Sequence, residues 1–340
     1  MEFLKEICEL VGTSGYEKDV RLFIEEKIKP YATEVYTDKI GNLIAFKKGK
    51  KEGKRVVVSA HMDEVGFMVR YITDDGYLKF ECIGGIDERV LAGRRVIFAK
   101  SGMLGIISAK AIHIQTPDER KKIVKVKDMY IDIGASSKEE AEKLVSVGDT
   151  AVFYPNYEEF GNDAIKSKAI DDRFGCAVMM EILKEELEYD TYFAFTTREE
   201  IGCRGAAAVA YALSPDFSIA VETTTAGDIC GTPKHMTACR LGNGAVISFM
   251  DNGTIYDPKA FRLAEELAKK NEIKYQLKDL VAGGNEASAY QKTALGSLTV
   301  AISAPCRYLH SASCVVKKSD LESVLGLVRV LINSDEVHNI

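Results

Sequence analysis

The chain has 340 residues, enough for one large domain or two medium-sized domains with a sizeable buried core. Hydrophobic residues make up 46% and charged residues 28%, which excludes disordered, collagen-like and disulfide-stapled proteins. The formal net charge of −6 argues against a broad nucleic-acid-binding surface, and no uncharged apolar run is long enough for a membrane span.

The first part of the chain predicts helices followed by strands. Mixed apolar and charged residues indicate a helix over 2–11, which the GTSG run at 12–15 ends, and an amphipathic helix over 16–29. Strands are expected at residues 34–37, 43–46 and 55–60. The run VVVSA at 56–60 begins with three β-branched residues, which is typical of a strand buried on both faces.

Short strands dominate residues 67–162. The DDG run at 74–76 and the SG pair at 101–102 are hairpin signals between apolar segments. The expected strands cover residues 68–72, 77–82, 95–99, 105–109, 129–133 and 149–153, with a short helix candidate at 138–144. With almost no long helix, this segment predicts a small β-barrel or β-sandwich.

From about residue 163, strands and helices alternate again. Strands are expected at 192–197, 217–221, 245–250 and 298–303, and helices at 174–187, 205–213, 258–271 and 319–333. Ser319 and Glu322 have the spacing of a capping box, which predicts Ser319 as the N-cap of the last helix. The sequence therefore predicts an α/β fold that a β insertion interrupts.

Histidine and acidic side chains gather where the expected strands end, the place where open α/β sheets form their sites. The set consists of His61, Asp171, Glu199, Glu200, Glu222 and His310. Taken singly, such residues are more often structural histidines, solvated charges or helix caps. Two histidines and three of the four carboxylates together suit Zn²⁺, and five ligands with one shared carboxylate can hold two ions.

Glu199 and Glu200 are adjacent in the sequence. Because neighbouring residues of an extended chain point to opposite sides, the two cannot both bind one ion from a regular strand. One can bind metal while the other collects a proton from water that the cations have acidified.

Six segments resemble motifs of the M42 family of dinuclear metallo-aminopeptidases. They are AHMDEVGF at 60–67, GGID at 84–87, KAIDDRFG at 168–175, EEIGCRGA at 199–206, AGD at 226–228 and PCRYLH at 305–310. The resemblance spans residues 10–330 in the family's order. It implies a zinc-peptidase-like central mixed β-sheet flanked by helices, formed by residues 1–66 and 163–340. Residues 67–162 would form an inserted all-β barrel that serves dimerisation.

Carried over to the matching positions, the resemblance implies a dinuclear metal site. His61 and Glu222 would bind one ion, Glu200 and His310 would bind the other, and Asp171 would bridge them. Two divalent ions per subunit are implied. Zn²⁺ is the first expectation, and Co²⁺ or Mn²⁺ are alternatives because divalent affinities overlap.

Other residues receive supporting roles from the same resemblance. Glu199 would be the general base that takes a proton from the bridging water. Asp63 would orient the ring of His61. A strained peptide bond, for which a cis bond is one candidate, would precede Asp172 and turn the Asp171 carboxylate into the site.

Two positions depart from the family's pattern. Glu222 stands where the family usually has aspartate, so we expect metal binding to survive while the metal preference can shift. Glu286 ends the GGNE run at 283–286, where the family usually has a glycine-rich turn that ends in aspartate. That segment borders the family's substrate pocket, so the sequence leaves the preferred substrate side chain open.

The resemblance implies an aminopeptidase that acts on short peptides and forms homo-oligomers, from dimers to hollow dodecamers. The eight cysteines form no CxxC pair and no export signal is recognisable, which favours reduced thiols in a cytoplasmic protein. Cys306 and Cys314 flank His310, and we expect them to be packing residues rather than ligands. Neither nucleic acid nor a membrane is expected as a partner.

Three other functions stay open. Another metal-dependent amide hydrolase, such as a deacylase, is one alternative. Polysaccharide hydrolysis is disfavoured because it typically uses a pair of opposed carboxylates and aromatic platforms, and this chain has no Trp. A non-catalytic scaffold is disfavoured because Glu199 and the candidate ligands are all present.

Overall fold

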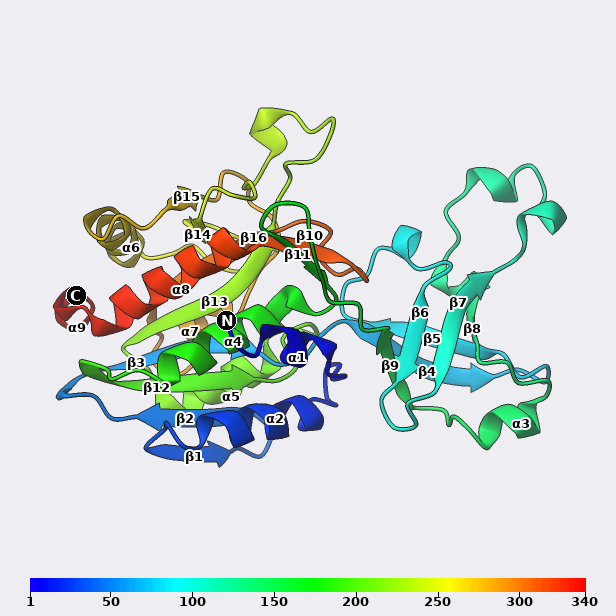
Figure 1. The fold of residues 1–340 in the computed structure, drawn as a ribbon, viewed down its shortest axis with the longest axis horizontal. Coiled ribbons are helices and arrows are strands. Elements are labelled where there is room, and N and C mark those ends of the chain that lie inside the picture. Colours follow the sequence, from blue (N-terminus) through cyan, green and yellow to red (C-terminus); the bar gives the residue numbers. More distant parts are fainter.

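The computed structural model describes residues 1–340 as two units that lie side by side (Figure 1). The larger unit is an eight-stranded sheet with helices on both faces, and the smaller unit is a closed β-barrel. The chain leaves the sheet after β3 (Lys51–His61) and returns through β11 (Ala164–Ser167). The predicted fold class, a central mixed sheet flanked by helices with an inserted barrel, is confirmed.

The large sheet is mixed, with the strand order β1-β2-β12-β3-β13-β16-β14-β15. Besides β3, its strands are β1 (Glu34–Thr37), β2 (Leu43–Lys47), β12 (Tyr189–Thr196), β13 (Phe217–Thr225), β14 (Ala245–Ile247), β15 (Tyr275–Leu277) and β16 (Leu298–Cys306). The four central strands β12, β3, β13 and β16 are parallel. Their carboxyl ends therefore share one edge of the sheet, where side chains from distant parts of the chain can meet.

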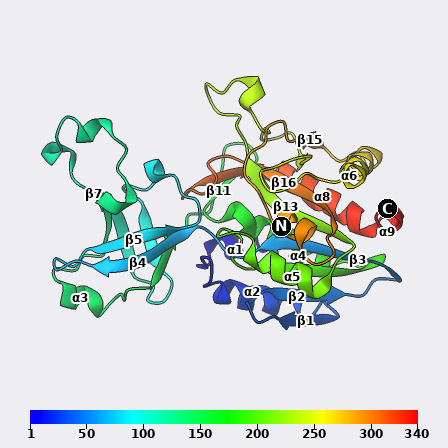
Figure 2. The ribbon, with the colours of Figure 1, turned by 180° about the vertical axis from the view of Figure 1, so that it is seen from behind.

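Helices cover both faces of this sheet. They are α1 (Leu4–Glu9), α2 (Lys18–Ile28), α4 (Ile170–Leu183), α5 (Arg204–Leu213), α6 (Pro258–Lys270), α7 (Ala287–Lys292), α8 (Lys318–Asn333) and α9 (Asp335–Asn339). The helix α8 lies on the face seen in Figure 1, and α5 lies on the face seen in Figure 2. None of the helices combines the length and the apolar composition that a bilayer crossing requires.

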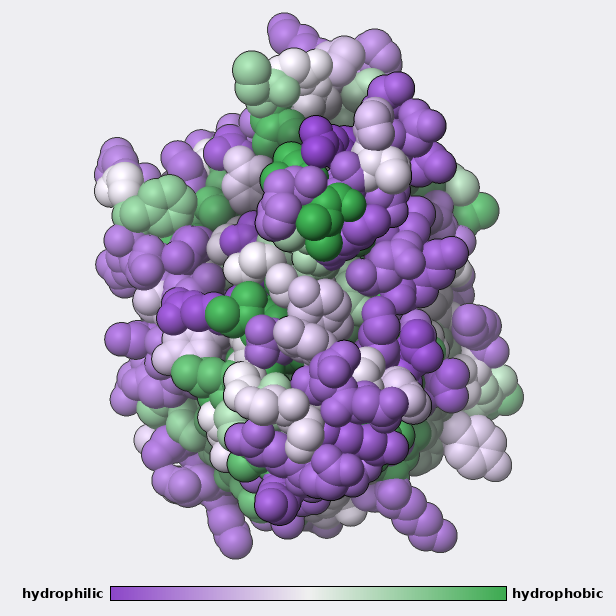
Figure 3. All heavy atoms as spheres, turned by 90° about the vertical axis from the view of Figure 1, so that its right-hand side faces the viewer, coloured by the Kyte–Doolittle hydropathy of each residue, from purple (hydrophilic) through white to green (hydrophobic).

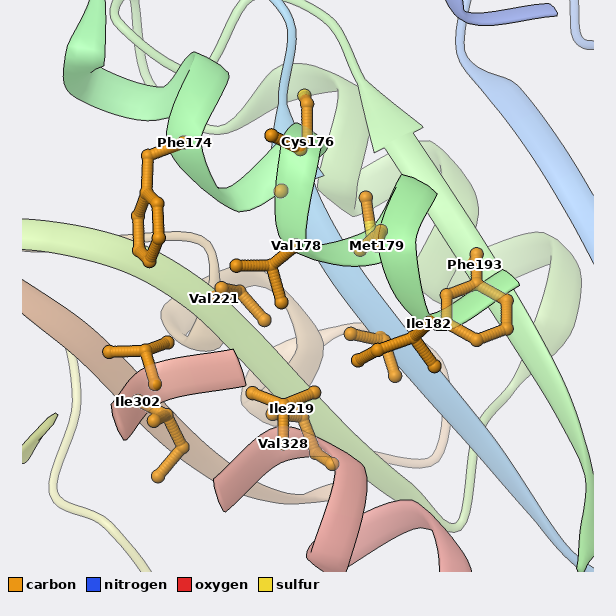
Figure 4. Close-up of a cluster of buried hydrophobic side chains, with 14 of the residues drawn as sticks. Phe174, Cys176, Val178, Met179, Ile182, Phe193, Ile219, Val221, Ile302 and Val328 are labelled. Atoms are coloured by element: carbon orange, nitrogen blue, oxygen red, sulfur yellow. The ribbon is translucent and has the colours of Figure 1, made fainter. Parts of the chain in front are cut away.

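Burial on both faces explains the continuous apolar run of β3. Val56 and Val58 belong to the large core with α4 and α8, whereas Val57 belongs to the smaller core with α5 and α7. Figure 4 shows part of the large core, where Phe174 and Val178 of α4 lie near β13. All residues of α4 except Glu181 are buried, because α1, α2 and α8 pack against this helix as well as the sheet.

The smaller unit is a barrel rather than a sandwich. Its strands are β4 (Gly66–Ile72), β5 (Leu78–Ile83), β6 (Arg95–Phe98), β7 (Leu104–Ala109), β8 (Met129–Asp132) and β9 (Thr150–Phe153), with the helix α3 (Lys138–Glu142) before β9. Pairing of β4 with β9 closes the ring. Phe67 fills the interior and makes edge-to-face contacts with Phe80 and Phe153, at centroid distances of 5.4 and 5.2 Å.

Several short elements were not predicted from the sequence. A three-stranded antiparallel sheet is formed by β10 (Glu158–Phe160), β11 and β17 (Cys314–Lys317). The strand β15 and the helices α7 and α9 were missed as well. Each has only three to six residues, so too few positions repeat for a periodic pattern to appear.

The predicted capping box at the start of α8 is wrong. The N-cap is Lys317, whose side chain makes no capping hydrogen bond, and the carboxylate of Asp163 accepts from the main-chain amide of Ser319 at 3.3 Å. The hydroxyl of Ser319 instead donates a hydrogen bond of 2.6 Å to the carboxylate of Asp163. Asp163 comes from a segment far away in the sequence, so the local spacing of Ser319 and Glu322 could not reveal this partner.

A buried ion cluster anchors the places where the chain leaves and re-enters the large unit. Glu64 accepts from Lys168 Nζ at 2.7 Å and from Arg173 Nη2 at 3.2 Å, and all three side chains are at most 2% exposed. Lys168 also donates to the carbonyl of Leu10 at 2.6 Å, and Arg173 donates to that of Met62 at 2.6 Å. The cluster therefore ties the start of the barrel, the return segment and the N-terminal helices together.

We expect the substitution Glu64→Gln to lower the free energy of unfolding by about 3 kcal/mol, because it leaves two buried cations without their anion. Equilibrium unfolding in urea measures the change. The control is Glu81→Gln, whose ion pair with Arg70 is exposed on the barrel and should contribute less than about 1 kcal/mol. Equal losses in the two variants would contradict a structural role for the buried cluster.

Candidate active site

The six candidate residues meet at the carboxyl edge of the parallel strands and line one cavity of about 300 Å³. His61 is the last residue of β3, and Asp171 lies in the first turn of α4. His310 follows β16. The sequence prediction placed Glu222 after its strand, but it lies within β13, because pairing with β16 extends that strand beyond the apolar run.

The carboxylate of Asp171 lies between the two histidines. Its Oδ1 is 3.3 Å from Nε2 of His61, and its Oδ2 is 3.2 Å from Nε2 of His310. Each oxygen thus faces a different imidazole, which is the arrangement that a carboxylate shared by two metal ions requires.

Both imidazoles are oriented by main-chain carbonyls. Nδ1 of His61 lies 3.0 Å from the carbonyl oxygen of Asp63, and Nδ1 of His310 lies 2.7 Å from that of Gly85. Because a carbonyl can only accept, each Nδ1 carries a hydrogen and each Nε2 is directed into the site. Gly85 belongs to the loop after β5, so the inserted barrel helps to orient His310.

The other candidate ligands surround these histidines. Glu200 Oε2 lies 3.3 Å from Nε2 of His310, and Glu222 Oε2 lies 3.9 Å from Nε2 of His61. Two groups bring ligand atoms within 4.8 Å of one another, namely His61 with Asp171 and Glu200, and His61 with Asp172 and Glu222. The second group includes Asp172, which the sequence prediction treated only as the neighbour of a strained bond.

The charges of the site are mutually dependent. Burial lowers the pKa of His310, but hydrogen bonding to Asp171 and the charge of Glu200 raise it to about 10. Burial raises the pKa values of Glu200 and Glu222 well above their ordinary range. A positive charge close to these two carboxylates would therefore stabilise their ionised forms.

The peptide bond between Asp171 and Asp172 is cis. This agrees with the cis alternative that the sequence motif suggested. Asp172 Oδ1 accepts from the main-chain amide of Gly175 at 3.0 Å, whereas its Oδ2 is buried and has no hydrogen-bond partner. Oε1 of Glu200 is also buried without a partner.

Asp63 holds the segment that carries both glutamates. Its carboxylate accepts from the main-chain amides of Glu199 and Glu200 at 3.0 and 3.2 Å, and from the hydroxyl of Ser14 at 2.6 Å. The carboxylate is 3.5 Å from Nδ1 of His61, farther than the carbonyl of the same residue. The predicted role of this carboxylate as the group that orients His61 is therefore secondary to its role in holding the turn.

Glu199 and Glu200 lie beyond the end of β12. They face different histidines: Oε2 of Glu199 is 3.9 Å from His61, while Glu200 is near His310. The expected separation of the two side chains is present, but a turn produces it rather than the alternation of a strand. Cys203 Sγ donates to Oε1 of Glu199 at 3.3 Å, so Oε2 is the oxygen directed at the site.

Glu286 lies behind the cavity rather than in its lining. Its carboxylate accepts from the hydroxyls of Ser59 and Thr196, and its main-chain amide lies 3.4 Å from Glu222 Oε1. Burial raises the pKa of Glu286 to about 7. Of the segment whose role the sequence left open, residues 283–285 line the cavity.

Cys306 and Cys314 do not join the candidate metal ligands. All eight cysteines are free, and Cys306 and Cys314 are buried. Neither belongs to a group of side chains that could hold a metal ion. Lys278, which also lines the cavity, was not singled out from the sequence, because nothing local distinguishes it from the other lysines.

Comparison with known proteins identifies the family. The family model described as M42 glutamyl aminopeptidase matches residues 41–327. The lysyl aminopeptidase of Pyrococcus furiosus is 34% identical and the alignment covers 97% of this chain and 96% of that protein. The TET aminopeptidase of a marine sediment archaeon (Thaumarchaeota) superposes with a TM-score of 0.95 at 36% identity, over 98% and 96% of the two chains.

A further structure, that of the Pyrococcus horikoshii TET1 peptidase, superposes with a TM-score of 0.86 at 36% identity, over 97% of this chain and 98% of that one. It is described as able to assemble into a tetrahedron or a large octahedral shell. The match of the family model extends over most of the chain, and the similarity to these proteins extends almost from end to end. The chain therefore belongs to the M42 family of aminopeptidases, as its sequence motifs predicted, and is a peptide hydrolase.

Proposed function

We propose that this enzyme removes single N-terminal residues from short peptides with the help of two divalent metal ions per subunit. Zn²⁺ is the first candidate, and Co²⁺ and Mn²⁺ are alternatives. The observation that carries the proposal is the position of Asp171, whose two oxygens each face Nε2 of a different histidine.

The residues present fit such ions. Imidazole nitrogens and carboxylate oxygens are ligands that Zn²⁺ accepts. Oε1 of Glu200, one of the proposed ligands, is buried without a hydrogen-bond partner, and a buried unpaired acceptor is costly unless a cation satisfies it. His61 and Glu222 would hold one ion, Glu200 and His310 the other, and Asp171 would be shared. Bound cations supply Lewis acidity to the scissile carbonyl and to the attacking water.

Glu199 is the proposed general base. Its Oε2 is directed at the site, and burial raises the pKa of its carboxyl group, which suits a group that must both take and release a proton. The carboxylate takes a proton as the water oxygen attacks the carbonyl carbon. It then gives the proton to the amine that leaves when the C–N bond breaks. An acidic side chain near the cluster would pair with the free α-amine of the substrate, which would confine cleavage to the chain end.

We further propose a cytoplasmic homo-oligomer. The similar TET1 peptidase can assemble into large shells. In this chain, the inserted domain 67–162 would form the contacts between subunits, and residues 1–66 and 163–340 would form the catalytic domain. The barrel end of the molecule carries hydrophobic areas among hydrophilic ones (Figure 3). Exposed apolar side chains of this unit include Leu104, Ile106, Ile112, Ile114 and Ile123.

A substrate panel tests the proposed activity. We expect the metal-loaded enzyme to hydrolyse amino-acid anilides and to leave N-acetylated anilides and a soluble glucan intact, with activity lost after treatment with a chelator. Cleavage of the acetylated compounds at an equal rate would indicate a deacylase instead. Activity only on the glucan, or no hydrolysis at all, would likewise overturn the proposal.

Substitution of the adjacent glutamates separates their roles. Glu199→Gln should lower kcat by about 10²- to 10⁴-fold, because only proton transfer is removed, while both metal ions remain. Glu200→Ala should lower the metal content of the purified protein instead. Metal analysis of the two variants measures the difference. If Glu199→Gln binds no metal and Glu200→Ala is fully loaded, the two roles are reversed.

The turn held by Asp63 offers a test that does not depend on turnover. Asp63→Asn replaces one carboxylate oxygen by an amide that cannot accept a hydrogen bond, so we expect metal affinity to fall by about 10- to 100-fold. Competition with a chromogenic chelator measures the affinity. Ser14→Ala removes one donor but leaves the bonds to both main-chain amides, and its effect should be smaller. Unchanged affinity in Asp63→Asn would show that the turn needs no such anchor.

A further inference from the structure

The carboxylate of Glu199, the proposed general base, needs more than its main chain to fix it. The main chain itself is held, because the carbonyl of Glu199 accepts from the amides of Gly202 and Cys203 at 2.8 and 2.9 Å. Its amide donates to Asp63 at 3.0 Å. The side chain, however, rotates about several bonds, and its Oε2 lies 3.9 Å from Nε2 of His61, too far for a hydrogen bond. A fixed main chain therefore does not decide where the two carboxylate oxygens lie.

One side chain holds this carboxylate. Sγ of Cys203 donates to Oε1 of Glu199 at 3.3 Å, and the structure gives the carboxylate no other hydrogen bond. Because both oxygens are joined rigidly to one carbon atom, engaging Oε1 also fixes the direction of Oε2. That direction is toward His61 and the candidate ligands. The thiol thus selects the oxygen that faces the site.

The backbone at Cys203 does not itself call for a cysteine. Its φ is 51°, in the left-handed region that favours glycine. The residue is also the N-cap of α5, where Ser, Thr, Asp or Asn would normally cap the helix, yet its side chain makes no capping hydrogen bond. The one hydrogen bond of this side chain is the bond to Glu199.

Packing accounts for only part of the surroundings of Cys203. The side chain is half-buried and lies against a small apolar cluster that includes Ala206 and Ala210 of α5. An apolar side chain of similar size would satisfy that contact equally well. Such a side chain could not supply the S–H donor that Oε1 of Glu199 accepts.

The surroundings also keep the thiol protonated. Burial and the negative charges of Glu199 and Glu286 raise the pKa of Cys203 above its ordinary value. The sulfur therefore carries its hydrogen at neutral pH and remains a donor while the carboxylate is ionised. Since a thiol is a weak donor, it can orient Oε1 without making the carboxylate a poor proton acceptor.

We propose that Cys203 is a positioning residue for the hydrolysis: its thiol holds Oε1 of Glu199 and thereby keeps Oε2, the oxygen that takes and returns the proton, directed at the site. This inference rests on the proposed function, in which Glu199 is the general base. The thiol takes no part in making or breaking bonds and binds neither substrate nor metal. Its loss should therefore lower kcat rather than the affinity for either.

The test compares Cys203→Ala with Cys203→Ser, because both lose the volume of the sulfur and only the second keeps a donor. In Cys203→Ala, kcat for amino-acid anilides should fall by about three- to tenfold, the effect of one hydrogen bond, with KM and metal content as in the wild type. Cys203→Ser should keep kcat within about twofold of the wild-type value, since its hydroxyl also donates. Steady-state kinetics and metal analysis of the purified proteins measure these quantities.

A double-mutant cycle separates positioning from packing. In the background of Glu199→Gln, which has lost the base, Cys203→Ala should cause no further fall in the residual kcat. Thermal unfolding shows whether each variant folds. If Cys203→Ala does not fold, Cys203→Gly replaces it as the variant without a donor, because glycine adopts the positive φ without strain. The same loss of kcat is expected in Cys203→Gly.

The possible failures are distinguishable. If the metal-loaded wild-type protein hydrolyses no anilide, the proposed function itself fails, and if Glu199→Gln keeps full activity, Glu199 is not the base. If kcat falls equally in Cys203→Ala and Cys203→Ser, or by the same factor with and without the Glu199 carboxylate, Cys203 acts through packing and the positioning role is wrong. That role is also wrong if the variants without a donor keep the wild-type kcat.

Discussion

Buried negative charge is concentrated at one edge of the sheet, and the surrounding structure is organised around it. The side chains of Glu200 and Glu222 are 4% and 5% exposed, and both lie close to Asp171 and the two histidines. Like charges repel strongly where water is excluded, which is why burial and neighbouring carboxylates raise the pKa values of both glutamates. The imidazoles supply part of the opposing charge, and the proposed cations would supply the rest.

Such a cluster needs a rigid frame, because small displacements change these electrostatic energies considerably. The frame comes from four parallel strands that end at one edge and from α4, which carries Asp171 in its first turn. Arg173, two residues further on, is fully buried and donates to the carbonyls of Ile7 and Met62. The barrel contributes the carbonyl of Gly85 that orients His310. The site thus depends on both units, although most of its ligands come from the larger one.

The sequence was informative where the signal is local. The run before His61 predicted a strand buried on both faces, and that strand carries the histidine to the site edge. The sequence was less informative where the limits of an element depend on pairing between strands that are distant in the chain. The end of β13 is set by its partner β16, so Glu222 lies inside the strand, and closure of the barrel depends on the pairing of β4 with β9. Lys278 could not be recognised, because only the folded structure brings it to the wall of the cavity.

The two glutamates that replace the expected aspartates have different consequences for the cavity. Glu222 directs Oε2 toward His61 at 3.9 Å, and its Oε1 accepts from the main-chain amide of Glu286 at 3.4 Å. The carboxylate of Glu286 is engaged by two hydroxyls behind the cavity and is not part of its lining. It therefore adds no acceptor to the wall near Lys278. Of the two replacements, only the one at Glu222 therefore changes the lining of the cavity, where it lengthens a candidate metal ligand.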